Sequence, residues 1–168
     1  MIVSRLLSGA LSAAAVLLTA CSSSPGVGPL GKGYAPGSIC FPGTEGHEVT
    51  MGFYVIKNSG TASARIRSIT LPNAHGLRAT RVWLAPIRKN LLLGAGFPWP
   101  PRSPVWAHRM PASGAVIKAG ESLNIVFGIT RTSSAPARSD GPLVVYTAQG
   151  SAYTMRNGVS FEEAAHCS

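Results

Sequence analysis

Alternation of hydrophobic and polar residues predicts strands along most of the chain. The clearest case is SLNIVFGIT, whose faces separate into Leu123, Ile125, Phe127 and Ile129 on one side and Asn124, Val126, Gly128 and Thr130 on the other. Residues 48–57, EVTMGFYVIK, are rich in β-formers and run into the turn stretch NSGT. PLVVYTA and AYTMR, joined by the short turn 149–151, predict a hairpin. The candidate for one helical turn is FEEAAH, residues 161–166.

Two further stretches have strand composition with a slipped phase. In SARIRSITL, Ala64 and Ile66 share a face, whereas Ile69 and Leu71 have the opposite parity. A β-bulge near Ser68 would return the later pair to the core. GLRATRVWLAP shows a similar slip. About seven short strands with turn residues between them predict an all-β fold, an antiparallel β-sandwich.

The start of the chain is typical of an export signal. Arg5 precedes a mostly apolar stretch, residues 6–20, which is shorter than the roughly 20 apolar residues of a membrane-spanning helix. The stretch ends in Leu18-Thr19-Ala20-Cys21, which resembles the lipobox of bacterial lipoproteins. In that family a signal peptidase cuts before the cysteine, whose sulfur carries a diacylglyceryl group. A retained membrane anchor and an ordinary secretory signal that leaves a spare thiol are the alternatives.

The lipobox resemblance implies an extracytoplasmic protein that is lipid-anchored to the bacterial cell membrane through Cys21. Residues 1–20 would then be the signal peptide, and residues 21–38, rich in Ser, Gly and Pro, would be a flexible tether. Residues 39–168 would form the folded head. Cys40 and Cys167 remain as an even pair in an oxidising compartment, so we expect a disulfide between them in preference to two free thiols.

The charge of the chain indicates an anionic partner. Lys and Arg number 15 against 6 Asp and Glu, which gives a formal net charge of +9. The arginines are spread singly without aromatic interleaving, and export removes cytoplasmic targets, so we expect no nucleic-acid binding. Anionic lipids or wall polymers, or an envelope protein, are the expected partners.

Catalytic motifs are absent from the sequence. There is no Gly-x-Ser-x-Gly and no His-Glu-x-x-His, and six carboxylates offer little for paired acid–base chemistry. We therefore predict that the protein is not an enzyme and holds no cofactor. The alternative function is an exported metal-binding or sensing protein that uses His and Met side chains, although no pair has the repeated spacing of a metal site. The candidate ligands are His47, His75, His108, His166, Met51, Met110, Met155, Glu162 and Glu163.

A strand that ends in Asn-x-Gly, an Ala/Ser/Arg-Ile strand and then AGESLNIVFGI together resemble the immunoglobulin-like domains of bacterial envelope proteins. The chain is similar in particular to small lipoproteins of actinobacteria, over roughly residues 46–157. This resemblance implies an immunoglobulin-like head that acts as a non-catalytic binding or accessory module. It transfers no catalytic residue to this chain.

Residues 94–111, GAGFPWPPRSPVWAHRMP, form the most unusual stretch of the head. Loops of this length in compact domains tend to be functional or disordered, and Trp with Arg is typical of binding hot spots. We expect a binding loop that emerges from one end or edge of the sandwich. In the alternative, its aromatic residues fold back to plug an open end. The candidate binding residues are Phe97, Trp99, Arg102, Trp106 and Arg109.

Overall fold

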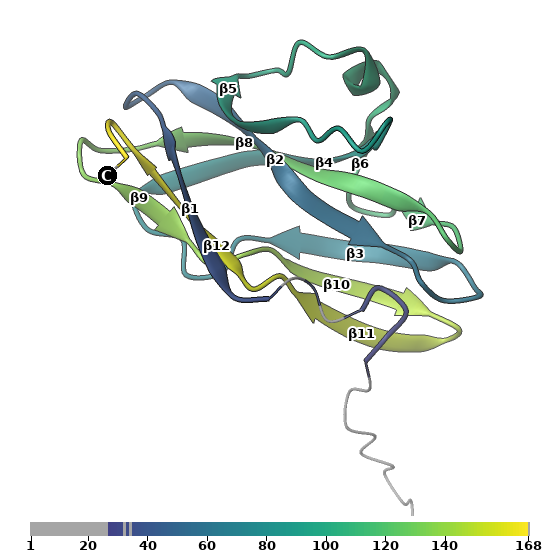
Figure 1. The fold of residues 1–168 in the computed structure, drawn as a ribbon. Coiled ribbons are helices and arrows are strands. Elements are labelled where there is room, and N and C mark those ends of the chain that lie inside the picture. Colours follow the sequence, from purple (N-terminus) through teal and green to yellow (C-terminus); the bar gives the residue numbers. More distant parts are fainter. Residues whose placement is uncertain (1–26, 32, 34, 168) are drawn as a thin grey trace, which may run out of the picture.

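Three β-sheets form an all-β, immunoglobulin-like sandwich (Figure 1). The computed structural model describes residues 27–31, 33 and 35–167, so the predicted signal peptide and Cys21 lie outside the described residues. The five-stranded sheet has the order β5 (Gly94–Pro98), β2 (Glu48–Lys57), β8 (Ser122–Arg131), β4 (Leu77–Pro86) and β6 (Met110–Pro111). The four-stranded sheet has the order β11 (Ser151–Arg156), β10 (Leu143–Ala148), β3 (Ala64–Thr70) and β7 (Val116–Ile117). The three-stranded sheet has the order β1 (Gly37–Pro42), β12 (Val159–Ala164) and β9 (Ala137–Ser139), and a 3₁₀ helix, η1, spans Pro104–His108.

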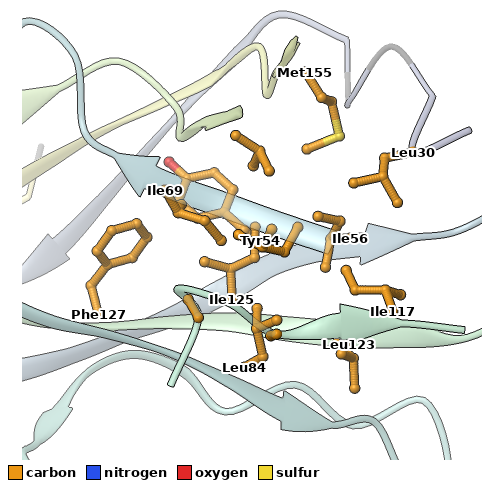
Figure 2. Packing of buried hydrophobic residues seen from close by; sticks show 14 of the residues in the cluster. Leu30, Tyr54, Ile56, Ile69, Leu84, Ile117, Leu123, Ile125, Phe127 and Met155 are labelled. Carbon is orange, nitrogen blue, oxygen red and sulfur yellow. The ribbon is translucent and has the colours of Figure 1, made fainter. Parts of the chain in front are cut away.

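The core lies between the four-stranded and five-stranded sheets, as the alternation predicts. On β8 the predicted inward residues are buried in one hydrophobic cluster with Tyr54 and Ile56 of β2 and Leu84 of β4 (Figure 2). The opposite sheet contributes Ile66 of β3 and Tyr146 of β10 to the same cluster. The hairpin of β10 and β11 also forms as expected, and its turn uses the left-handed backbone conformations of Gln149 and Gly150.

Both predicted phase slips are β-bulges. On β3, Ile66 pairs with Tyr146 and Ser68 pairs with Val145, which leaves Arg67 as the extra residue and keeps the following isoleucine in the core. On β4 the register shifts between Ala79 and Arg81, so Thr80 is the extra residue. The extra residue of the second bulge, Thr80, lies beside Gly128 of β8 and lines the cleft described below.

The end of the chain is a strand and not a helical turn, which corrects the interpretation of FEEAAH. β12 pairs in parallel with β1 and antiparallel with β9. Phe161 stacks on Phe41 with ring centroids 5.7 Å apart, and both rings belong to the central core. Non-local pairing of this kind outweighs the weak helical tendency of a six-residue segment.

The expected disulfide is present. Cys40 of β1 is bonded to Cys167, just beyond β12, with 5.7 Å between their Cα atoms. The bond joins positions separated by 127 residues in sequence. It therefore links β1, near the start of the described head, to the segment that follows β12 near its end.

The predicted tether, residues 21–38, is wrong for its C-terminal part. Leu30 is 4 % exposed within the core cluster, and its backbone N–H donates to the Tyr146 hydroxyl at 3.3 Å. The Ser59 N–H donates to the carbonyl of Pro29 at 2.8 Å, and β1 already begins at Gly37. A single leucine in a Gly- and Pro-rich segment gains enough from burial to hold that segment on the head. Within the part of the chain that the structure describes, no helix has the length and apolar content to span a membrane.

Candidate functional site

Residues 93–109, which we call the strap, begin with the edge strand β5 and then cross the outer face of the five-stranded sheet. The strap passes from β5, which pairs with β2 at one edge of the sheet, to β6, which pairs with β4 at the other edge. Figure 1 shows it on the side of this sheet that faces away from the four-stranded sheet. The strap therefore leaves the sheet at one edge and rejoins it at the other, as expected for a loop at an edge, but between these points it lies over the face of the sheet and does not project from it. The alternative is met in part, because Trp106 is buried and Trp99 packs against it, but these rings cover a face of the sheet and not an open end of the sandwich.

The strap is fixed to the sheet by hydrogen bonds from side chains and backbone. The amide of Asn124 on β8 accepts from the Leu93 N–H at 3.0 Å and donates to the Tyr54 carbonyl at 2.8 Å. The Trp99 N–H donates to the carbonyl of Glu48 at 3.3 Å. The two hydrogen bonds of the Asn124 amide allow this polar side chain to be almost completely buried at the centre of the sheet.

Three tryptophans form the centre of the strap's contact with the sheet. Trp106, in η1, is 7 % exposed and packs in a second hydrophobic cluster with Ala85 and Val126. Its ring meets the rings of Trp99 and Trp83 edge-on, with centroids 5.1 Å and 6.0 Å away. Edge-to-face geometry is the favourable arrangement for aromatic quadrupoles. Trp106 is thus a structural residue of the strap, while Trp99 and Trp83 are each only partly buried.

Arg109 is held over these rings although the residue is exposed. Its Cζ atom lies 4.8 Å from the Trp106 centroid and 5.0 Å from the Trp83 centroid. Its Nη1 donates to the Trp106 carbonyl at 3.0 Å. Cation–π contacts with two indoles and one hydrogen bond fix the plane of the guanidinium. Among the described residues the one ion pair joins Arg156 and Asp140, so Arg109 has no carboxylate partner there.

Beside Arg109 the strap and the sheet enclose a cleft of about 470 Å³. Gly128 of β8 lies beneath it, where a Cβ atom would come within 3.0 Å of the Trp99 ring and of the Thr80 hydroxyl. The Thr80 hydroxyl, placed by the β4 bulge, lies within hydrogen-bonding distance of the Glu48 carboxylate and the Gly128 carbonyl, and both of these acceptors share its single proton. The cleft thus combines aromatic surface with one carboxylate and two guanidinium groups. Its lining residues are Glu48, Thr80, Arg81, Trp83, Trp99, Pro100, Trp106 and Arg109.

The structure separates the five predicted binding residues into two groups. Trp99, Trp106 and Arg109 line the cleft, whereas Phe97 and Arg102 border a second groove. Phe97 is 59 % exposed, and this groove is otherwise formed by Leu91, Leu92, Leu93, Pro98, Pro101 and Ser103.

Sequence reasoning missed four members of the cleft, which come from β2 and β4: Glu48, Thr80, Arg81 and Trp83. Trp83 could have been predicted, because it is adjacent to the buried Leu84 on the predicted strand and side chains alternate along a strand, so its ring must lie on the outer face of the sheet. The other three have no distinguishing pattern, since their proximity depends on how β2 and β4 flank β8.

The described residues contain no group of three or more His, Cys, Asp and Glu side chains placed to hold a metal ion. Glu163, a candidate ligand, is instead buried beside Gly43 with no hydrogen-bond partner among these residues. Glu162, its neighbour, lines a separate cavity of about 430 Å³ with His75 and Asp140.

Comparisons with known proteins give one structural likeness. No family model matches the chain, and no curated protein matches it. Among solved structures, the chain is similar to the ASH/PapD-like domain of human CEP192 (PapD-like domain 7), with 12% sequence identity and a TM-score of 0.43. The likeness covers 95% of this chain and 99% of that chain.

Proposed function

We propose that the protein is a lipid-anchored component of the cell envelope whose immunoglobulin-like head binds a partner in the cleft between the strap and the sheet. The observation that carries this proposal is the exposed guanidinium of Arg109, fixed over two indoles at the edge of a cleft. Interface hot spots are enriched in Trp and Arg that are oriented before binding, because such groups lose little entropy on association. Anchoring through Cys21 is supported by the lipobox and by the pairing of the other two cysteines with each other.

The placement of the cleft suits a head that is held at a membrane by its N-terminus. Pro29 and Leu30 contact the head near Ser59 and Tyr146, so the chain joins the head beside the four-stranded sheet. The cleft is lined by residues of the strap and of β2 and β4. The strap lies on the outer face of the five-stranded sheet (Figure 1). A partner in the envelope can then reach the cleft without contact with the described N-terminal segment at Pro29 and Leu30.

Binding fits the chemistry of the cleft better than catalysis does. The hydroxyl of Thr80 is already bonded to the carboxylate of Glu48, and the other charged groups of the lining are guanidinium groups, which stay protonated. This set can orient and neutralise a ligand, and its one carboxylate is already engaged by the Thr80 hydroxyl, so we infer binding and not catalysis.

The test is affinity capture from the native envelope with the full-length chain extracted in mild detergent. Trp99→Ala is expected to reduce partner recovery, because it removes the half-buried ring of the cleft. Phe97→Ala is the matched control, since it removes an exposed aromatic side chain of the same strap outside the cleft. Equal recovery with wild type and Trp99→Ala, or a loss confined to Phe97→Ala, would refute the assignment of the cleft.

A further inference from the structure

Arg109 has hydrogen-bonding capacity that the described contacts do not use. A guanidinium carries five N–H donors, and the hydrogen bond to the Trp106 carbonyl uses one nitrogen, Nη1. The planar fork matches the two oxygens of a carboxylate or phosphate, and cation–π contacts with Trp83 and Trp106, together with the hydrogen bond to the Trp106 carbonyl, hold that fork in place before any ligand arrives. Arg81 lines the same cleft and adds a second positive charge. These groups indicate a ligand with an oxyanion.

The remainder of the lining indicates that this ligand also has a flat apolar face and hydroxyl groups. Trp99 lies against the backbone at Gly128 and contributes its partly exposed indole to the cleft. The negative face of an aromatic ring attracts polarised C–H bonds, such as those on one face of a sugar ring. The Glu48 carboxylate and the Thr80 hydroxyl supply acceptors beside it for hydroxyl donors.

We infer that the cleft binds an acidic saccharide unit, with its oxyanion on Arg109 and its ring on Trp99, an inference that rests on the proposed function. An extended peptide is a poorer fit, because strand addition needs the free backbone of a sheet edge, whereas the cleft lies over the face of a sheet. A lipid head group of the anchoring membrane is also a poorer fit, because the described contacts of Pro29 and Leu30, where the chain joins the head, are with Ser59 and Tyr146 and not with the cleft. The chain has 15 Lys and Arg residues against 6 Asp and Glu residues, and this positive charge favours an acidic polymer as the source of the saccharide unit.

Tryptophan emission gives a direct assay, because the chain has 3 tryptophans and all of them line the cleft. The full-length chain in non-ionic detergent is titrated with trigalacturonate, with the neutral trimer galactotriose, with inorganic phosphate and with a short-chain phosphatidylglycerol. We expect trigalacturonate to change the emission saturably and to bind at least about tenfold more tightly than galactotriose, with weaker binding at high salt. Equal binding of the two trimers, or no binding of trigalacturonate, would overturn the inference.

Variants locate the oxyanion. Arg109→Gln is expected to weaken trigalacturonate binding about tenfold or more, and Arg109→Lys to weaken it less, because lysine keeps the charge without the fork. Arg67→Gln is the control, since Arg67 is exposed on β3 in the other sheet. A thermal melt of each variant verifies folding, and Arg109→Lys still tests the fork geometry if Arg109→Gln melts early. Equal losses from Arg67→Gln and Arg109→Gln would overturn the inference in favour of non-specific charge attraction.

The two remaining probes separate the sources of an anion. Phosphate or phosphatidylglycerol that binds as tightly as trigalacturonate would overturn the saccharide assignment and indicate a bare anion site or a lipid site. If Trp99-dependent capture from the envelope persists while trigalacturonate does not bind, the proposed function stands and only the ligand class is wrong.

Discussion

Glu163→Gln tests the electrostatics of a buried carboxyl group on β12. Glu163 is 0 % exposed, and neither of its carboxylate oxygens has a hydrogen-bond partner among the described residues. The nearby guanidinium of Arg131 donates instead to the carbonyls of Gly43, at 3.0 Å, and Ser134, at 2.7 Å. Burial therefore raises the pKa of Glu163 to about 7, and the positive charge of Arg131 only partly opposes the rise.

The sign of the resulting pH dependence follows from the two states of the chain. The ordinary pKa of the carboxyl is 4.5, and this value applies to the unfolded chain. Between 4.5 and about 7 the folded chain holds a proton that the unfolded chain has released, so the free energy of unfolding falls as the pH rises. The contribution is fully present below 4.5 and is lost above about 7. At 1.36 kcal/mol per pKa unit this loss amounts to about 3 kcal/mol.

Glutamine has nearly the shape of a protonated glutamic acid and does not ionise. Glu163→Gln should therefore resemble wild type at about pH 4 and be more stable by about 3 kcal/mol at about pH 8, as measured by urea unfolding with the disulfide intact. Glu162→Gln, on the same strand at a partly exposed position, controls for the removal of one negative charge. A difference between wild type and Glu163→Gln that stays constant within about 0.5 kcal/mol over this range would refute the reasoning.

Three further predictions concern the anchor, the disulfide and the strap. Cys21→Ala should move the protein out of the membrane fraction, and retention at the wild-type level would contradict lipidation. Replacing Cys40 and Cys167 together by serine should lower the free energy of unfolding by about 5 kcal/mol in urea, because the bond closes a loop that spans 127 positions. A loss below about 1 kcal/mol would contradict this chain-entropy argument. Trp106→Ala should cost about 3 to 5 kcal/mol of unfolding free energy, whereas Trp99→Ala, at a partly buried position, should cost less than half as much; equal costs would contradict their different roles.

Local rules were sufficient for the long strands of the two main sheets, namely β2, β3, β4, β8, β10 and β11. They missed the short strands β5 and β6, which lie within the expected loop 94–111, and β7. The interpretation of residues 48–57 as a strand matches β2 at both ends, and the alternation of β8 correctly predicted its inward residues. The bulge in β3 could be predicted because two isoleucines with opposite parity cannot both reach one core without an extra residue between them. In each case the residues that determine the structure lie within about ten positions of one another.

Non-local contacts account for the errors. β12 is a strand because β1, more than a hundred residues earlier, pairs with it and because Phe41 stacks on Phe161. Leu30 is ordered because it fits the core near Tyr146. Composition around either segment gives no sign of these partners, so the sequence alone predicts a helical turn for residues 161–166 and a tether for the segment that contains Leu30.

The side chains on the outward face of β8 determine how the strap packs on the five-stranded sheet. Asn124 has the amide needed to hold Leu93, and Val126 gives Trp106 an apolar surface. Gly128 has no side chain, which leaves room for Trp99 between the sheet and the cleft. A longer or charged side chain at any of these positions would separate the strap from the sheet and release Arg109 from the two indoles. The proposed binding cleft therefore depends on residues of β8 that do not line it, and if the proposal is right, mutations beneath the strap should weaken binding as strongly as mutations in the cleft itself.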